Sequence, residues 1–133
     1  MTVLDNPILQ NKIKIRSGAL YIDKDDIFIT KFDDNIKLEK ADLIEILELY
    51  KIMSKSQPML SLAVAGQFTS VTTEARIYVE KNASVSIAEA FVVNSIAQRF
   101  LIMVYMKLQR KKHPTKVFTD IKAAKKWLLS QAY

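Results

Sequence analysis

The pattern of apolar and polar positions in the first third of the chain has the period of β-strands. Apolar residues alternate with polar ones or form short runs in "KIKIR" (12–16), "ALYI" (19–22) and "IFITKF" (27–32). The turn-forming pair Ser17-Gly18 and the acidic segment "DKDD" (23–26) separate these runs. Because such short links join antiparallel neighbours, this part predicts an antiparallel β-meander.

The pattern then changes to the period of a helix. Between residues 39 and 55 the apolar side chains recur three, four, seven and ten positions after the first of them: Leu43, Ile46, Leu47, Tyr50 and Met53. This spacing places them on one face of a helix. Acidic side chains near its start and lysines near its end complement the helix dipole, and Pro58 prevents continuation.

From residue 59 onward strands and helices alternate. Apolar runs predict strands at 59–65, 85–93 and 116–118, and helices are expected at about 71–81, at 95–111 and after Thr119 or Asp120. The inner face of the last helix comprises Ile121, Ala124, Trp127 and Leu128. The order β-β-β followed by α-β-α-β-α-β-α predicts an α/β fold with a mixed, mainly parallel sheet. We expect one domain over residues 11–133, preceded by an N-terminal segment of residues 1–10.

The composition limits the class of protein. Of 133 residues half are apolar, two are Gly and three are Pro, which suits one folded core. The absence of Cys excludes disulfides, thiolate metal sites and cysteine catalysis, and it suits a reducing compartment. The N-terminus has no signal-peptide pattern, and the longest apolar run, residues 100–106, is far too short for a membrane span. We therefore expect a cytoplasmic protein that does not insert into membranes.

The net charge of +6 is concentrated at the C-terminal end. Residues 107–133 contain a single acidic residue, Asp120, and eight basic ones: Lys107, Arg110, Lys111, Lys112, Lys116, Lys122, Lys125 and Lys126. A basic surface suits nucleic acid or anionic lipid. However, no aromatic stacking platform accompanies these charges, and the lysines of the last helix share its outer stripe. We interpret them as a solvated face and do not expect nucleic-acid binding.

Two segments resemble the SpoIIAA-like fold, which includes the STAS domains. "AFVVNSIAQRFL" (90–101) is similar to the strand, polar corner and helix of its short, mostly uncharacterised bacterial members. "PTKVFTDIKAAKKWL" (114–128) is similar to their C-terminal strand and helix. The resemblance covers residues 11–130 and implies a non-enzymatic binding or regulatory module that acts through protein–protein contacts.

A hydroxyl-rich segment, "GQFTSVTTEAR" (66–76), lies where STAS antagonists carry a phosphorylated corner. By the resemblance, Ser70 is the counterpart of the serine that accepts phosphate. The segment lacks the Asp that precedes and the Gly that follows the hydroxyls in that family.

The same segment has a second interpretation from its residues alone. Thr69 or Ser70 would cap the following helix, which is the commoner use of such residues. Alternatively, the carboxyl edge of a parallel sheet and a helix N-terminus would form an anion or small-ligand site. The candidate residues at this edge are Gln67, Thr69, Ser70, Thr72, Asn94 and Ser95. The last two leave the neighbouring strand, so we expect the two corners to converge.

The predicted helix 95–111 is apolar on nearly all sides. Its residues Ile102, Met103 and Met106 lie away from the core stripe. Either a neighbouring element covers them, or they form a face for a protein partner or a second copy of the chain. The second possibility predicts a homodimer.

Signals of catalysis are sparse. His113 is the only histidine, and its position beside Pro114 in a basic turn predicts a surface location. No phosphate loop or dinucleotide fingerprint is present, and the aspartates of 23–26 fit a turn better than a calcium loop. We therefore expect no enzyme activity, no cofactor and no metal site.

One carboxylate stands out in an apolar strand. Glu89 shares the parity of Val85, Ile87 and Phe91, so it predicts either a buried ion pair with Arg76 or Arg99 or a position at the open end of the strand. A strongly shifted pKa of this carboxylate would indicate an active site. The alternative function, independent of Glu89, is a domain that binds a small apolar or anionic ligand between the first helices and the carboxyl edge of the sheet.

Overall fold

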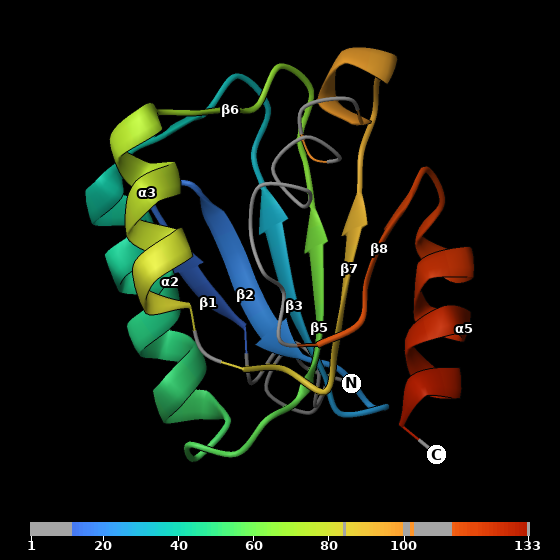
Figure 1. The fold of residues 1–133 in the computed structure, drawn as a ribbon. Helices are drawn as coiled ribbons and strands as arrows, with labels where there is room; N and C mark the ends of the chain where they lie inside the picture. The colour runs from blue at the N-terminus through green and yellow to red at the C-terminus, as the bar shows by residue number, and fades with distance from the viewer. Residues whose placement is uncertain (1–11, 84, 100–101, 103–112, 133) are drawn as a thin grey trace, which may run out of the picture.

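The computed structural model describes residues 12–83, 85–99, 102 and 113–132. They form a six-stranded mixed sheet in the order β1-β2-β3-β5-β7-β8 and a small sheet of β4 and β6 (Figure 1). The strands are Ile13–Ile15 (β1), Gly18–Ile22 (β2), Ile27–Phe32 (β3), Lys37–Leu38 (β4), Leu60–Val64 (β5), Ser70–Val71 (β6), Ala88–Val92 (β7) and Thr115–Phe118 (β8). The helices are Lys40–Met53 (α2), Thr73–Asn82 (α3) and Ile121–Gln131 (α5). The predicted α/β class with a mixed sheet is confirmed.

The first three strands form the predicted antiparallel meander. The turn between β2 and β3 is built around Asp23, whose Oδ1 accepts hydrogen bonds from the N–H groups of Asp25 and Ile27 at 2.9 and 3.0 Å. Asp26 adopts a φ of 59°, which completes the reversal. The acidic segment is therefore a turn, as predicted, because an aspartate side chain can satisfy the amides that follow it.

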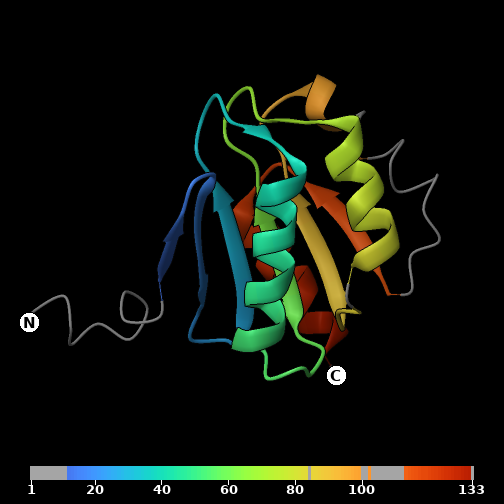
Figure 2. The same cartoon turned by 90° about the vertical axis from the view of Figure 1, so that its left-hand side faces the viewer.

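The strand β3 and the three later strands of the large sheet, β5, β7 and β8, run parallel to one another. Helices α2 and α3, which connect parallel strands, cover one face of the sheet, whereas α5 follows the last strand and covers the other face (Figures 1 and 2). Crossovers of one hand place their helices on the same side, which accounts for this arrangement. The sheet therefore separates two helical layers.

The N-terminal end of α2 is held by an ion pair with Arg16, which lies in the turn between β1 and β2. Arg16 binds the Asp42 carboxylate with two nitrogens, Nε to Oδ1 at 2.8 Å and Nη2 to Oδ2, and Nη2 also donates to the Lys37 carbonyl. Asp42 Oδ2 accepts the Glu39 N–H at 2.9 Å. The hydrogen bonds from Arg16 hold the pKa of Asp42 below its ordinary value of 3.8, although burial of the carboxylate acts in the opposite direction. The hydrogen bond from the Glu39 N–H also lowers this pKa, but by less.

The last helix packs with its predicted inner face. Ala124 and Leu128 are fully buried, and Ile121 and Trp127 pack against the same cluster. The Asp120 side chain caps the helix by accepting the Ala123 N–H at 2.9 Å. The solvated stripe predicted for this helix is wrong at one position, because Lys125 Nζ pairs at 2.9 Å with the buried Asp23 carboxylate.

Several predicted boundaries differ from the structure. The strand expected at 85–93 contains only Ala88–Val92, and the helix expected from about 71 begins at Thr73. Residues 70–71 instead form β6, which pairs in parallel with β4. Neither two-residue strand has a detectable period, so sequence periodicity could not find them. The N-terminal segment 1–10 and most of the predicted helix 95–111 lie outside the described residues.

Candidate functional site: a groove between the sheet and two helices

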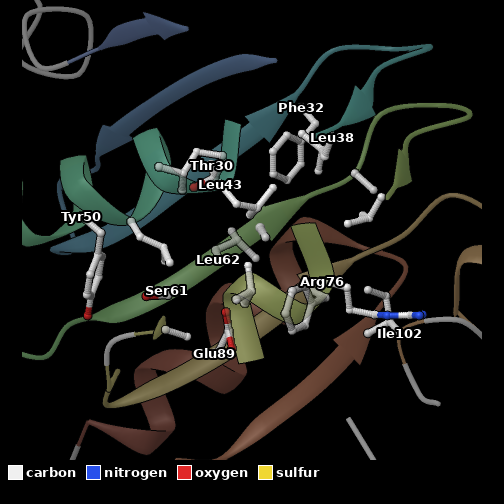
Figure 3. Close-up of a pocket in the computed structure, with 18 of the residues that line it drawn as sticks. Thr30, Phe32, Leu38, Leu43, Tyr50, Ser61, Leu62, Arg76, Glu89 and Ile102 are labelled. Atoms are coloured by element: carbon white, nitrogen blue, oxygen red, sulfur yellow. The ribbon is translucent and has the colours of Figure 1, made fainter. Parts of the chain in front are cut away.

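A groove of about 590 Å³ lies between the sheet and the helices α2 and α3 (Figure 3). Its walls are mainly apolar and come from both helices, from β3, β5 and β7 of the large sheet, and from β4 and β6. The apolar lining includes Phe28, Phe32, Leu38, Leu43, Ile46, Leu47, Val79, Phe91 and Ile102. Polar lining residues include Thr30, Tyr50, Ser61, Arg76, Ser86, Glu89, Gln98 and His113. A volume of this size falls in the range of small-molecule sites, about 300–1,000 Å³.

The groove exists because the central strand β5 has small side chains on this face of the sheet. Along β5, Ser61 and Ala63 face the groove, whereas Leu60 and Leu62 face the core under α5. In register, Ser61 lies between Phe28 and Glu89, and Ala63 lies between Thr30 and Phe91. The large side chains thus fill one face of the strand, and the short ones leave space on the other.

The floor of the groove carries a histidine–carboxylate pair. His113 Nε2 lies 3.3 Å from Glu89 Oε1, and the His113 side chain is only 8% exposed. The surface location predicted for His113 is wrong, because the β8 strand that it precedes brings it against β7. Glu89 is 24% exposed and pairs with His113 rather than with the two predicted arginines. Figure 3 shows its carboxylate directed into the groove.

A chain of hydroxyl groups continues this polar floor. Tyr50 Oη accepts the Met59 N–H at 3.0 Å and lies 3.4 Å from Ser86 Oγ. Ser86 Oγ lies 3.0 Å from Ser61 Oγ, and both serines are buried. The Tyr50 ring also packs edge-on against Phe28, with ring centroids 5.0 Å apart. These contacts fix the hydroxyl groups before any ligand binds.

The hydroxyl-rich segment lies at the upper edge of the groove, where Thr69 and Ser70 line it. Neither residue is the helix cap that the sequence suggested. Instead Thr72 Oγ1 accepts the Ala75 N–H at 3.1 Å and caps α3. Thr69 Oγ1 donates to the Gly66 carbonyl at 2.9 Å, and Ser70 belongs to β6. The cap lies later in the chain than predicted, because residues 70 and 71 are held in an extended conformation by the pairing of β6 with β4.

The two corners at this edge converge, as predicted. Asn94 Nδ2 donates to the Ala65 carbonyl at 2.6 Å, and Gln98 Nε2 donates to the Gly66 carbonyl at 3.0 Å. Ser95 Oγ accepts the Gln98 N–H at 3.1 Å and so caps the helical turn that follows it. The side chains of Asn94 and Gln98 therefore hold the two corners together, whereas Ser95 is engaged within its own corner.

The loop between β5 and β6 contains a feature that the sequence did not reveal. Phe68 is 78% exposed and has a φ of 57°, a backbone region that bulky residues rarely adopt. The loop is held on both sides, since Gln67 N–H donates to Asp34 Oδ1 at 2.7 Å and Gln67 O accepts the Asn35 N–H at 2.7 Å. Residue 66, at the start of this loop, has to be glycine, because a Cβ at Gly66 would lie 2.4 Å from the Asp33 carbonyl oxygen.

Of the predicted interface residues only Ile102 lies in the described part of the chain. It is half-buried and lines the groove. Met103 and Met106 lie outside the described residues, as do Lys107, Arg110, Lys111 and Lys112.

The described residues contain no group of three or more His, Cys, Asp or Glu side chains placed to hold a metal ion. Among the same residues, every helix is too short or too polar to cross a bilayer.

Comparison with known proteins gives a family but no activity. No curated protein and no solved structure matches the chain, so the resemblance to SpoIIAA-like domains stays a hypothesis. The family model described as "Domain of unknown function (DUF7793)" matches residues 20–132. Because this match covers most of the 133 residues, the chain belongs to the DUF7793 family.

Proposed function

We propose that this domain binds a small ligand with an apolar body in the groove beneath α2 and α3. The observation that carries the proposal is the hollow of about 590 Å³ above Ser61 and Ala63, at the centre of the sheet. Apolar walls supply the driving force for binding, and the few polar groups of the floor fix the orientation of the ligand. The role is that of a binding or regulatory module in the cytoplasm.

The chemistry of the floor supports binding rather than covalent catalysis. Nucleophilic catalysis needs a hydroxyl group within hydrogen-bond reach of a general base. Here His113 Nδ1 accepts the backbone N–H of Ser86 at 3.2 Å, and Nε2 faces Glu89. Both imidazole nitrogens are thus engaged by groups other than the serine hydroxyls, which contact each other instead.

A fluorescent apolar probe, 1-aminoanthracene, tests this proposal. We expect saturable binding with one site per chain, and we expect Ala63→Leu to weaken it about tenfold or more, because three added carbon atoms enter the hollow. Ala123→Leu is the matched control, since the same change at an exposed position of α5 leaves the groove unaltered. Absence of saturable binding, or equal binding by wild type and Ala63→Leu, would overturn the proposal.

A second candidate function is contact with another protein, in the simplest case a second copy of the chain. It is supported by two exposed apolar side chains on linked corners, Phe68 at 78% and Ile96 at 88% exposure. The hydrogen bonds from Asn94 and Gln98 to the loop of Phe68 make these corners one unit. Exposed aromatic and aliphatic side chains of this kind are typical anchors of protein interfaces.

Sedimentation velocity tests the simplest form of this candidate. Wild type is expected to self-associate with increasing concentration, and the double variant Phe68→Ser, Ile96→Ser is expected to remain monomeric. A wild type that stays monomeric up to high micromolar concentration would exclude the homodimer.

A further inference from the structure

A buried threonine hydroxyl group faces the groove without a partner. Along β3, Thr30 lies between Phe28 and Phe32, and all three line the groove, whereas the alternate residues of β3 face the core under α5. Thr30 is only 5% exposed, and no group in the described part of the chain forms a hydrogen bond with its hydroxyl group. Figure 3 shows this side chain among the apolar side chains of the groove. Because an unpaired buried hydroxyl group is unfavourable, Thr30 points to a ligand group that completes its hydrogen bonding.

A second hydroxyl group, that of Ser61, ends a chain of hydrogen bonds whose direction follows from counting protons. Tyr50 Oη donates its single proton to the Val85 carbonyl at 3.3 Å, so it accepts at its 3.4 Å contact with Ser86 Oγ. Ser86 Oγ thus donates to Tyr50, and it accepts the proton of Ser61 Oγ at 3.0 Å. In this direction all three hydroxyl protons are paired, and both lone pairs of Ser61 Oγ are unused.

The opposite direction of the chain is less favourable. If Ser86 donated to Ser61, the proton of the buried Ser61 would have no acceptor, and one hydrogen bond would be lost. A ligand that donates to Ser61 adds a hydrogen bond to the complete chain, whereas a ligand that accepts from Ser61 first has to reverse the chain. Ser61 therefore favours an N–H or O–H group of the ligand.

The two hydroxyl groups lie on neighbouring strands beside the hollow above Ala63. Ala63 pairs in register with Thr30, and Ser61 precedes Ala63 by two residues on the same face of β5. The spacing of strands, and of residues along a strand, places the Cα atoms of Thr30 and Ser61 about 8 Å apart. A bicyclic ring system above Ala63 can therefore direct one polar group toward each hydroxyl group.

We infer that the ligand of this groove is uncharged and carries a carbonyl or ether oxygen that accepts from Thr30 and, at its opposite end, an O–H or N–H group that donates to Ser61. This inference rests on the proposed function. Neither hydroxyl group can compensate an ionic charge between apolar walls, so neutral polar groups are favoured at both positions. An acceptor is favoured at Thr30, because buried donors are left unpaired less often than acceptors. The ligand class is therefore a hydroxylated ketone or ether with an apolar ring system.

Three compounds with the same bicyclic skeleton provide the test. Tetralin has no polar group, 1-tetralone adds a carbonyl oxygen, and 6-hydroxy-1-tetralone adds a phenol group at the opposite end. Binding to the full chain is measured by ¹H–¹⁵N NMR titration at slightly acidic pH, where the phenol is protonated. The measured quantities are two ratios of affinity, 1-tetralone to tetralin and 6-hydroxy-1-tetralone to 1-tetralone, so that the shared apolar body cancels.

Two substitutions assign the two contacts. Thr30→Val keeps the shape of the side chain and removes its hydroxyl group, so the first ratio should fall about fivefold and the second should stay unchanged. Ser61→Ala should lower the second ratio about fivefold and leave the first unchanged. Ser70→Ala is the matched control, because it removes a hydroxyl group at the exposed rim of the groove, and it should leave both ratios unchanged.

A measurement without any ligand tests the unpaired hydroxyl group directly. Thr30→Val should raise the free energy of unfolding in urea denaturation or leave it unchanged, because no hydrogen bond is lost with the hydroxyl group. A lower value would show that Thr30 already has a partner in the folded protein, which would overturn the inference.

The outcomes separate the inference from the proposed function. If tetralin binds in the groove but either ratio is unaffected by its own substitution, the inference is overturned and the proposed function stands. If none of the three compounds binds and 1-aminoanthracene also fails to bind, both are overturned. If Ser70→Ala lowers a ratio as much as Thr30→Val or Ser61→Ala does, the inference is overturned, because the polar group of the ligand then lies at the rim.

Discussion

Ala63 and Ala90 lie on adjacent parallel strands and face opposite sides of the sheet. Ala63 pairs with Phe91, and its neighbour in the chain, Leu62, pairs with Ala90. Ala90 is fully buried in the core under α5, whereas Ala63 lines the groove and is half-buried. The same residue type therefore stands at a filled site and at a hollow site within one pair of strands.

This relationship predicts that enlarging the two alanines has opposite consequences for stability. Ala90→Leu should lower the free energy of unfolding by about 1–3 kcal/mol, because added methylene groups have no space in a packed core. Ala63→Leu should leave it unchanged within about 1 kcal/mol or raise it, because the new atoms occupy a hollow. Urea denaturation of both variants and wild type measures the difference.

The comparison also tests whether the groove is empty in the folded protein. A loss of stability in Ala63→Leu as large as that in Ala90→Leu would mean that the space above Ala63 is filled. In that case the proposed ligand site does not exist.

The cap of α3 gives a second prediction. Thr72→Ala should lower the free energy of unfolding by about 1 kcal/mol, since the Ala75 N–H loses the oxygen that it donates to. Ser70→Ala, two residues earlier on an exposed strand, should change it by less than about 0.5 kcal/mol. Thermal or urea unfolding distinguishes the two, and an equal loss in both variants would show that Thr72 is not the cap in solution.

The order of strands and helices in the described part of the chain could be read from the sequence, because these elements have recognisable periods and turn residues. The apolar positions Ile46 and Tyr50 of α2, and Ala124 and Leu128 of α5, were predicted and are buried. Period-based reasoning failed where elements are very short, as in β4 and β6, and at the boundaries of β7 and α3. Elements that are long enough to show an apolar period can thus be predicted from the neighbouring residues alone.

The site was harder to predict, because it depends on contacts between distant residues. Glu89 and His113 meet only through the register of β7 with β8, 24 positions apart in the chain. The hollow had a readable signal, the alternation of large and small residues in "LSLAVA" (60–65), which we interpreted only as an apolar run typical of a strand. Small residues at every second position indicate one face that packs and one that leaves space.

The Arg16–Asp42 pair predicts how stability depends on pH. The pKa of Asp42 is lowered in the folded state, chiefly by the Arg16 hydrogen bonds, so folding favours the ionised carboxylate. Its contribution is fully present above the ordinary value of 3.8 and is lost as the pH falls through the lower folded pKa. The difference in unfolding free energy between wild type and Asp42→Asn should therefore be constant at neutral pH and shrink only below about pH 4.

Arg16→Gln provides the complementary measurement. Without the guanidinium group the pKa of Asp42 should rise, and the acid-unfolding midpoint of the variant should lie at higher pH than that of wild type. A wild-type advantage over Asp42→Asn that disappears between pH 5 and 7 would contradict this account, because that range lies above the ordinary pKa of aspartate.

The exposed Phe68 gives the last prediction, which concerns the cost of its backbone conformation. At a φ of 57° a side chain of any size is strained, and glycine is not. Phe68→Gly should therefore be more stable than Phe68→Ala by about 1 kcal/mol. At Ile96, which is also exposed but lies in a helical turn, the order should reverse, and Ile96→Ala should be more stable than Ile96→Gly by up to about 1 kcal/mol.

Urea denaturation of the four variants measures both differences. If alanine is preferred at both positions, Phe68 is not held in the left-handed region in solution. If glycine is preferred at Phe68, the chain keeps an exposed aromatic side chain at an energetic cost, as expected of a residue retained for a contact.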